Sequence, residues 1–479
     1  MKKTFINRAA WAVVVSAAIG MTGCDKILDT SSPSQLSSSD IFKTPSRIAG
    51  LVNGAYKSLK SAGGRLFLNA DIRGEEFINL TNNAYTGFDG WANNYSGSSA
   101  DVASVWESYY ATINNVNILI DGLEKTTGVI SEEQKKQYVA EARFIRAVSY
   151  FSLVTLYARP YAEGNGAGKA LPLRLLPETS VANKDLARST VAQVYEQILK
   201  DLDVAETNLP EKYGTNELNT TRAHRNTAIA FKTRVYLNIG QYPNVVKEAV
   251  KIVPQADAPF AATTGVLHAL QTNIVTIFSS NYTTTESVFS FPVTQADGPV
   301  TALGASYNAN ADFSLNTEGI HGSTQWGASD ARRNMVRLNT ANSQYFLTKY
   351  AKPSPFLDYI PVVRYAEVLL NYAEAAARTG NQSLAVKLLK AVHGRSDAGY
   401  VFAAGDIDTE TNLVNTIWKE RRIELLGEGF RSNDLLRNLL TIPAKRSSSF
   451  NARAVPPTDA AYVWSIPNTE IVSNKLINQ

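Results

Sequence analysis

Cysteine is almost absent from this chain, because only Cys24 among 479 residues carries a thiol. One thiol excludes a disulfide framework and any metal site that needs several cysteines. Histidine is also scarce: the 4 histidines are widely spaced and lack the H-x-x-x-H or H-E-x-x-H pattern of a zinc site. No uninterrupted apolar run reaches the ~18 to 20 residues that a membrane-spanning helix needs. The sequence therefore predicts neither a metal centre nor a multi-pass membrane protein.

An excess of charge of one sign is lacking as well. The chain has 47 basic and 43 acidic residues, and the first 23 residues hold three of the basic ones and no acidic one. Removal of that segment leaves 44 basic and 43 acidic groups, with no block of lysine or arginine. Because nucleic-acid affinity comes mainly from neutralising phosphates, we expect no nucleic-acid partner. The hydrophobic content of 44% is typical of a globular chain with a large core.

Motifs of common catalytic sites are missing. There is no G-x-S-x-G nucleophile elbow and no G-x-x-x-x-G-K-[ST] phosphate loop. Asp71, Glu75 and Glu76 are the group that comes nearest to the two carboxylates of a glycoside hydrolase. Arg73 lies among them, which favours a charged structural turn held by ion pairs. We therefore predict a protein that is not an enzyme and needs no cofactor, with a glycoside hydrolase as the alternative.

The first 23 residues have the pattern of an export signal. Lys2, Lys3 and Arg8 form a basic start, an apolar stretch follows, and Thr22-Gly23 leads directly into Cys24. This ending resembles a bacterial lipoprotein signal, in which the cysteine sulfur is acylated and becomes the new N-terminus. We therefore expect a signal peptide at 1–23 and a lipid anchor on Cys24, with a serine-rich tether over 24–40. The alternative is an ordinary secretory peptide with an incidental cysteine.

The remaining residues, 41–479, are expected to form one domain made mainly of paired helices. Ala228–Ile239 is followed by Gly240 and a second helix over Tyr242–Val253, and a helix from Pro361 is followed by Gly380 and another helix. Further helices are predicted at Val102–Leu123, Glu132–Tyr157, Thr190–Asn208 and Leu413–Leu426. A helix, a glycine turn and a helix in repetition resemble tetratricopeptide units. The alternative is an irregular helical domain without true repeats.

Two segments interleave aromatic rings with amides, namely Asn79–Ser99 and Ser306–Trp326. Flat rings offer apolar faces to sugar C–H groups or peptide side chains, and asparagine both donates and accepts hydrogen bonds. The predicted ligand contacts are Trp91, Asn94, Tyr95, Tyr307 and Trp326. The alternative for each segment is that its rings anchor a long loop to the helical body.

The stretch from Lys419 to Arg437 is rich in arginine and carboxylates. On a helix, Glu420 and Glu424 lie one turn apart beside Arg421 and Arg422. This pattern favours a partly buried network of arginine–carboxylate pairs that fixes the C-terminal helices, because guanidinium groups bind carboxylates two at a time. The alternative is an anion-binding site.

Taken together, these residues resemble the SusD/RagB-like nutrient-binding lipoproteins of Bacteroidetes. The C-terminal part of the resemblance lies in residues 420–425 (ERRIEL), 427–431 (GEGFR) and 434–437 (DLLR). Other segments agree in order: 24–29 (CDKILD), 106–117 (WESYYATINNVN), 141–157 (EARFIRAVSYFSLVTLY), 188–202, 364–374 (RYAEVLLNYAE) and 466–470 (IPNTE). Local departures include Phe430, which stands where the family often has histidine.

The resemblance implies a non-enzymatic, surface-exposed lipoprotein of the outer membrane. Its fold would be mainly α, with tetratricopeptide-like helix pairs as a scaffold and long irregular loops with minor β structure on the ligand-binding side. It would capture a glycan or oligosaccharide, or in some members a peptide, and deliver it to a SusC-like TonB-dependent barrel. A pure interaction scaffold without a small ligand remains a further alternative.

Overall fold

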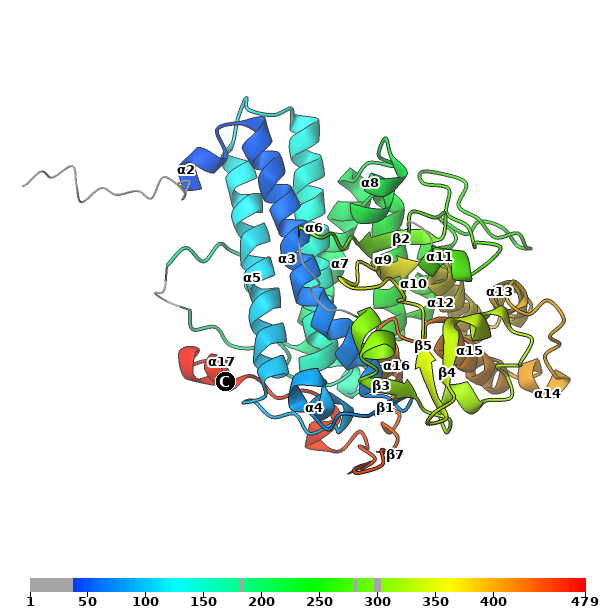
Figure 1. Ribbon diagram of the computed structural model, residues 1–479. Coiled ribbons are helices and arrows are strands. Elements are labelled where there is room, and N and C mark those ends of the chain that lie inside the picture. The colour runs from blue at the N-terminus through cyan, green and yellow to red at the C-terminus, as the bar shows by residue number, and fades with distance from the viewer. Residues whose placement is uncertain (1–37, 181–183, 280–281, 297–302) are drawn as a thin grey trace, which may run out of the picture.

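Four long helices form one half of the molecule: α3 (Pro45–Ile72), α5 (Ala100–Lys125), α6 (Glu132–Tyr157) and α7 (Val191–Asn208). The computed structural model describes residues 38–180, 184–279, 282–296 and 303–479, so the predicted signal peptide and Cys24 lie outside the described residues. Three of these helices, α3, α6 and α7, start where a side chain caps free N–H groups. Thr44 and Ser131 accept from the third residue of α3 and α6, and Thr190 forms a capping box with Gln193. Figure 1 shows α3, α5 and α6 side by side.

Two helical hairpins continue this packing. They are α9 (Arg225–Asn238) with α10 (Tyr242–Ala249), and α12 (Tyr365–Arg378) with α13 (Gln382–Gly394). Gly240 and Gly380 make the turns at φ +69° and +84°, in the left-handed region that glycine enters without strain. Consecutive helices from α5 through α6, α7, α9, α10 and α12 to α13 pack as neighbours. The prediction of a mainly helical, tetratricopeptide-like scaffold is confirmed.

One predicted helix start is wrong. Pro361 does not open a helix but lies in strand β6 (Ile360–Arg364), which pairs antiparallel with β2 (Ser287–Phe291), and α12 begins only at Tyr365. The β-branched pair Val362-Val363 fits a fully buried strand, so the local preference for extended structure decides this segment. The second helix of the first hairpin is also shorter than predicted and ends at Ala249 instead of Val253.

Helices α3 and α2 are among the helical segments that were not expected from the sequence. Helix α3 contains four glycines, which weaken a helical pattern, and it is stabilised by burial of Ile48, Val52 and Leu59. Helix α2 (Ser38–Ile41) occupies the last residues of the predicted tether, so residues 38–40 are helical.

Strands are short and pair only in twos within the described residues: β1 (Phe77–Asn79) with β3 (Phe313–Leu315), β2 with β6, β4 (Val336–Asn339) with β5 (Gln344–Leu347), and β7 (Lys445–Arg446) with β8 (Asn451–Ala452). The remaining α-helices are α4 (Phe88–Trp91), α8 (Asn216–Thr221), α11 (Val275–Ser279), α14 (Ala404–Ile407), α15 (Glu410–Glu424), α16 (Arg431–Arg437) and α17 (Asn468–Ser473). Short helical turns include η2 (Ala84–Thr86), η4 (Ala305–Ala309) and η5 (Ile320–Gly322).

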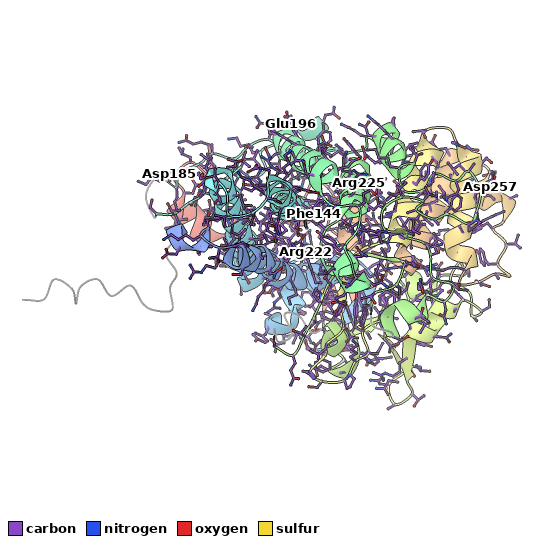
Figure 2. All side chains as sticks on the ribbon, turned by 90° about the horizontal axis from the view of Figure 1, so that it is seen from above. Phe144, Asp185, Glu196, Arg222, Arg225 and Asp257 are labelled. Atoms are coloured by element: carbon purple, nitrogen blue, oxygen red, sulfur yellow. The ribbon has the colours of Figure 1, made fainter. Side chains whose placement is uncertain are left out.

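A single large core joins the helices to the β2–β6 pair. Phe144 of α6 lies at its centre, and its ring contacts Phe231 of α9 at 5.9 Å and Phe289 of β2 at 5.4 Å between centroids (Figure 2). In the described part of the chain, no helix is both long and apolar enough to cross a membrane.

Candidate ligand-binding site

Trp91 is buried, contrary to its predicted role as an exposed platform. It ends the short helix α4, and its indole N–H donates to the carbonyl oxygen of Phe77 at 2.7 Å. The ring stacks on Phe88 with 6.0 Å between centroids, and Nζ of Lys445 lies 5.3 Å from its centre. A ring enclosed in this way has no free face for a ligand, so the prediction that Trp91 is exposed is wrong.

Tyr307 and Trp326 are buried as well. Tyr307 stacks on Phe77 at 4.7 Å and faces Tyr350 at 6.3 Å, while the Arg333 guanidinium lies 4.1 Å from the centre of Trp326. The two aromatic segments meet at the β1–β3 pairing, where Asn79 lies opposite Phe313. The alternative interpretation, that these rings anchor long loops, is the one that their burial supports. The physical reason is that loops without a helical or sheet face must bury their own apolar groups to stay on the body.

Tyr95 is half-buried and Asn94 is exposed. The Tyr95 hydroxyl donates to Asn69 and lies 3.3 Å from a carboxylate oxygen of Asp101, and its ring packs on Trp464 at 4.6 Å. Burial, reinforced by the Asp101 charge, raises the pKa of Tyr95 well above its usual value. Tyr95 thus joins loop and helix, and Asn94 is the predicted contact that remains accessible to solvent.

An exposed aromatic surface does exist, but it is built from other rings of the same loop and from a distant hairpin. We call the set Tyr85, Phe88 and Phe450 the aromatic rim. Tyr85 in η2 is 82% exposed and Phe450 in the β7–β8 hairpin is 41% exposed, while Phe88 is half-buried. The Phe88 and Phe450 rings meet edge to face with 5.1 Å between centroids. Figure 1 shows α4, β1 and β7 together at the lower edge of the molecule.

A buried lysine holds the hairpin in this position. The Lys445 ammonium donates to three carbonyl oxygens at the end of α3, those of Ile72, Arg73 and Gly74, at 2.5, 3.0 and 2.7 Å. These carbonyls lack a helical partner because α3 ends there, so the lysine satisfies them and fixes β7 to the helix. Phe450 is missing from the predicted contacts because no local pattern links the hairpin to residues 79–99.

Polar side chains surround the aromatic rim. Asn82 donates its amide to the Ser449 hydroxyl, which joins the loop to the hairpin tip, and Arg446 donates to Asn451 at 2.9 Å. The Arg65 guanidinium lies 5.9 Å from the Tyr85 ring. Exposed rings beside amides, hydroxyls and guanidinium groups suit an uncharged, hydroxyl-rich ligand.

The carboxylates near Arg73 form no acid–base pair open to solvent. Glu75 pairs with Arg431 at 2.5 Å and with Arg422 at 2.9 Å, and Glu76 pairs with Arg422 at 2.6 Å. Burial raises the pKa of Glu75, but Arg431 and Arg422 outweigh this and leave it below its usual value. The predicted ion pairs are present. Their basic partners are Arg422 and Arg431, which lie about 350 residues further along the chain, and not the neighbouring Arg73.

The predicted arginine–carboxylate network at the C-terminal helices is confirmed, and its main members are buried. Arg364 pairs with Glu286 at 2.6 Å, with Glu424 at 2.8 Å and with Glu428 at 2.7 Å. Arg332 joins Glu420 and Glu424 of α15, which lie one helical turn apart as expected. Burial raises the pKa of Glu424, yet neighbouring arginines hold it well below its usual value. No group of three or more metal-binding side chains occurs among the described residues.

Two stretches of the chain match known sequence families. Residues 26–237 match a SusD-like family described as starch-binding and associating with the outer membrane, and residues 336–479 match the SusD family. A solved SusD superfamily protein from Bacteroides fragilis is 31% identical, over 92% of this chain and 100% of its own, with a TM-score of 0.82. The chain belongs to the SusD family.

Other SusD relatives are more distant. The SusD-like protein P38 of Formosa agariphila is 21% identical over 91% of this chain and 92% of its own length. A solved protein described as a laminarin-binding SusD-like protein is 21% identical, covers 90% of this chain and 98% of its own, and has a TM-score of 0.69. At this identity the likeness concerns the fold.

The SusD-like segment 106–117 has a structural role in this chain. Asn117 donates to the carbonyl oxygens of Arg174 and Leu176 at 2.9 and 3.3 Å, and Asn114 both donates to and accepts from the backbone of Glu178. These amides hold an irregular segment, residues 172–178, along α5. The motif therefore positions a loop on the helical scaffold.

Proposed function

We propose that this chain is a lipid-anchored, cell-surface binding protein that captures an oligosaccharide and passes it to a SusC-like TonB-dependent barrel in the outer membrane. The observation that carries the proposal is the aromatic rim, an exposed set of rings beside amides and hydroxyls on a rigid helical body of the SusD family. The description of one family as starch-binding and of one structural relative as laminarin-binding favours glycan over peptide as ligand.

The mechanism follows from the geometry of the rim. Sugar rings stack on the exposed rings of Tyr85 and Phe450, while Phe88 packs edge to face against Phe450. Asn82, Asn83 and Asn451 are exposed around these rings and offer amide groups to hydroxyls, and Asn94 at the end of α4 is a further contact of this kind. Each contact is weak, and an oligomer gains affinity by occupying several at once. The rim holds the ligand without changing it chemically.

Calorimetry against a panel of oligosaccharides and peptides tests the ligand class. We expect binding of a glycan, and we expect Tyr85→Ala and Phe450→Ala each to weaken it by roughly 1 to 3 kcal/mol. The matched control is Val401→Ala, because Val401 is 84% exposed at a distant site. Normal glycan binding by both ring variants would place the site elsewhere. Binding of peptides alone would make this a peptide-binding member, and release of new reducing ends would identify a hydrolase.

The lipid anchor has a separate test. Cys24→Ala removes the sulfur that carries the acyl chains, so the protein is expected to leave the membrane fraction and appear in the soluble fraction. Co-purification of a barrel with the anchored chain tests delivery to a transporter. Unchanged membrane association of Cys24→Ala would contradict the anchor and leave ligand binding untouched.

A further inference from the structure

Five apolar side chains are exposed at one end of the molecule. They come from the irregular segment after residue 172 and from α17, and we call them the apolar end: Leu175, Leu176, Leu186, Ile471 and Val472. Leu176 is 78% exposed and Val472 is 83% exposed, so these two project fully from the body. The loop itself encloses a hollow of about 450 Å³, which is lined by Leu173, Leu175, Leu176 and Leu186 among others. Clusters of exposed apolar groups are uncommon on soluble surfaces and mark contact sites.

Hydrogen bonds and an ion pair hold the two parts of the apolar end together. The Asn474 side chain accepts from the backbone N–H of Leu186 at 2.9 Å and donates to its carbonyl oxygen at 2.8 Å. The backbone N–H of Lys475 donates to Asp185 at 2.7 Å, and Arg174 pairs with Glu470 at 3.4 Å. Asn117 holds Leu176 from α5. Because the loop and α17 are joined at several points, their apolar side chains form a fixed surface.

This surface lies on the side of the molecule from which the chain continues toward Cys24. Figure 1 places α2 and α17 on the left side, α2 near the top and α17 near the bottom, and Figure 2 places Asp185 on the same side. Helix α2 begins at Ser38, 14 residues after Cys24. At about 3.3 to 3.6 Å per residue, this length of chain spans at most about 50 Å. A lipid on Cys24 therefore keeps a membrane within reach of the apolar end.

We propose that the apolar end docks on the lipid surface that holds the anchor, and so fixes the orientation of the body on the membrane. This inference rests on the proposed lipid anchor. Lipid is the occupant that the structure favours, because the side chains project outward and the tether length brings a bilayer to them. Exposed Lys184 and Lys475 flank the leucines and are available to lipid phosphates, and the exposed carboxylate of Asp185 accepts a hydrogen bond from the backbone N–H of Lys475. Docking at a second point would keep the aromatic rim at a constant angle to the membrane.

The scarcity of cysteine makes a direct test possible. Cys24 is the only cysteine and its sulfur is consumed by acylation, so a new cysteine is the only site for a thiol-reactive fluorophore. The test uses the full lipidated chain with Val472→Cys or Val401→Cys, in vesicles of phosphatidylethanolamine and phosphatidylglycerol that contain nitroxide-labelled lipid. The two valines are matched, being 83% and 84% exposed, and Val401 lies just before α14 at the opposite end (Figure 1).

We expect the nitroxide lipids to quench most of the fluorescence at position 472 and almost none at position 401. Leu176→Asp, combined with the label at 472, should reduce that quenching without unfolding the protein, because the Leu176 side chain is largely exposed. Equal quenching at both positions in chains that float with the vesicles would overturn the docking and leave the anchor standing. Failure to float would overturn both. Shielding of position 472 only in membranes that contain a transporter would assign the apolar end to a protein partner and also overturn the proposal.

Discussion

His224 and His268 form a buried pair between the helical half and the β2 region. Their Nε2 atoms are 3.4 Å apart, and the rings are nearly parallel with 5.2 Å between centroids. The Nδ1 atom of His268 lies 3.0 Å from the carbonyl oxygen of Thr285, so the N–H at Nδ1 donates there and Nε2 accepts from His224. Burial lowers the pKa of His268 to about 4, and burial together with the neighbouring His268 lowers that of His224 well below its usual value.

This pair predicts a loss of stability in acid. The unfolded chain binds a proton on each histidine near pH 6.5, whereas the folded chain resists protonation of His268 until about pH 4. Stability is therefore full above pH 6.5 and falls as the pH drops toward 4, by about 3 kcal/mol for His268 alone. Urea unfolding at pH 7 and pH 4.5 measures this. The variant with His224→Gln and His268→Gln should show a smaller difference between the two pH values, and an equal difference would assign the acid sensitivity to other groups.

At the scale of elements, the β7–β8 hairpin shows how one side chain joins parts that are distant in the sequence. Lys445 is buried and saturates three carbonyl groups at the end of α3, and the hairpin then presents Phe450 next to Phe88. The aromatic rim therefore depends on a contact between residues about 370 positions apart.

Replacement of this lysine should affect both folding and ligand binding. Lys445→Met keeps much of the side-chain volume but leaves the three carbonyls of α3 without a donor, so we expect a loss of roughly 2 to 5 kcal/mol in the free energy of unfolding. Denaturant unfolding measures this, and calorimetry under native conditions should show weaker glycan binding. Arg446→Met is the control for the unfolding measurement alone, because the neighbouring Arg446 is exposed. If Lys445→Met is as stable as the control, the hairpin is held by other contacts.

At the scale of the whole molecule, the buried arginine–carboxylate network connects the β2–β6 pair with α15 and the turn that follows it. Arg364 at the start of α12 reaches Glu286 before β2, Glu424 in α15 and Glu428 in the following turn. A guanidinium group that pairs with several carboxylates fixes the relative positions of the segments that carry them, and it also compensates the carboxylate charges.

Breaking the network should be far more costly than breaking an exposed pair. Arg364→Met removes the one cation that pairs with all three buried carboxylates, and we expect a loss of about 3 to 5 kcal/mol of unfolding free energy. Arg453→Met is the matched control, since Arg453 pairs with Asp459 at the surface and its side chain is 58% exposed. That change should leave the free energy of unfolding almost unaltered, because an exposed ion pair is screened by solvent. Similar values for the two variants in urea unfolding would contradict a stabilising role of the network.

Much of the helical scaffold was predictable because its signals are local. Helices α6 and α7 begin directly after the capping residues Ser131 and Thr190, and their apolar side chains recur with the helical period. The turns of the two hairpins follow from Gly240 and Gly380. Local signals were weak for α3, whose glycines obscure it, and misleading at Pro361, where pairing with β2 prevails. The arginine network was predictable in kind, since a helix brings Glu420 and Glu424 together, but its partner Arg332 was not.

The candidate site shows what could not be predicted from the sequence. Composition identified a loop rich in rings and amides and excluded a disulfide or a cysteine-based metal site, the apolar period indicated the helix pairs, and motifs carried the resemblance to the family. Which rings are buried and which are exposed depends on the neighbours that each meets, so tertiary structure placed Trp91, Tyr307 and Trp326 inside and left Tyr85 outside. It also brought Phe450 and the apolar end into position. The physical reason is that local preferences act over a few residues, whereas burial is a property of the whole packed chain.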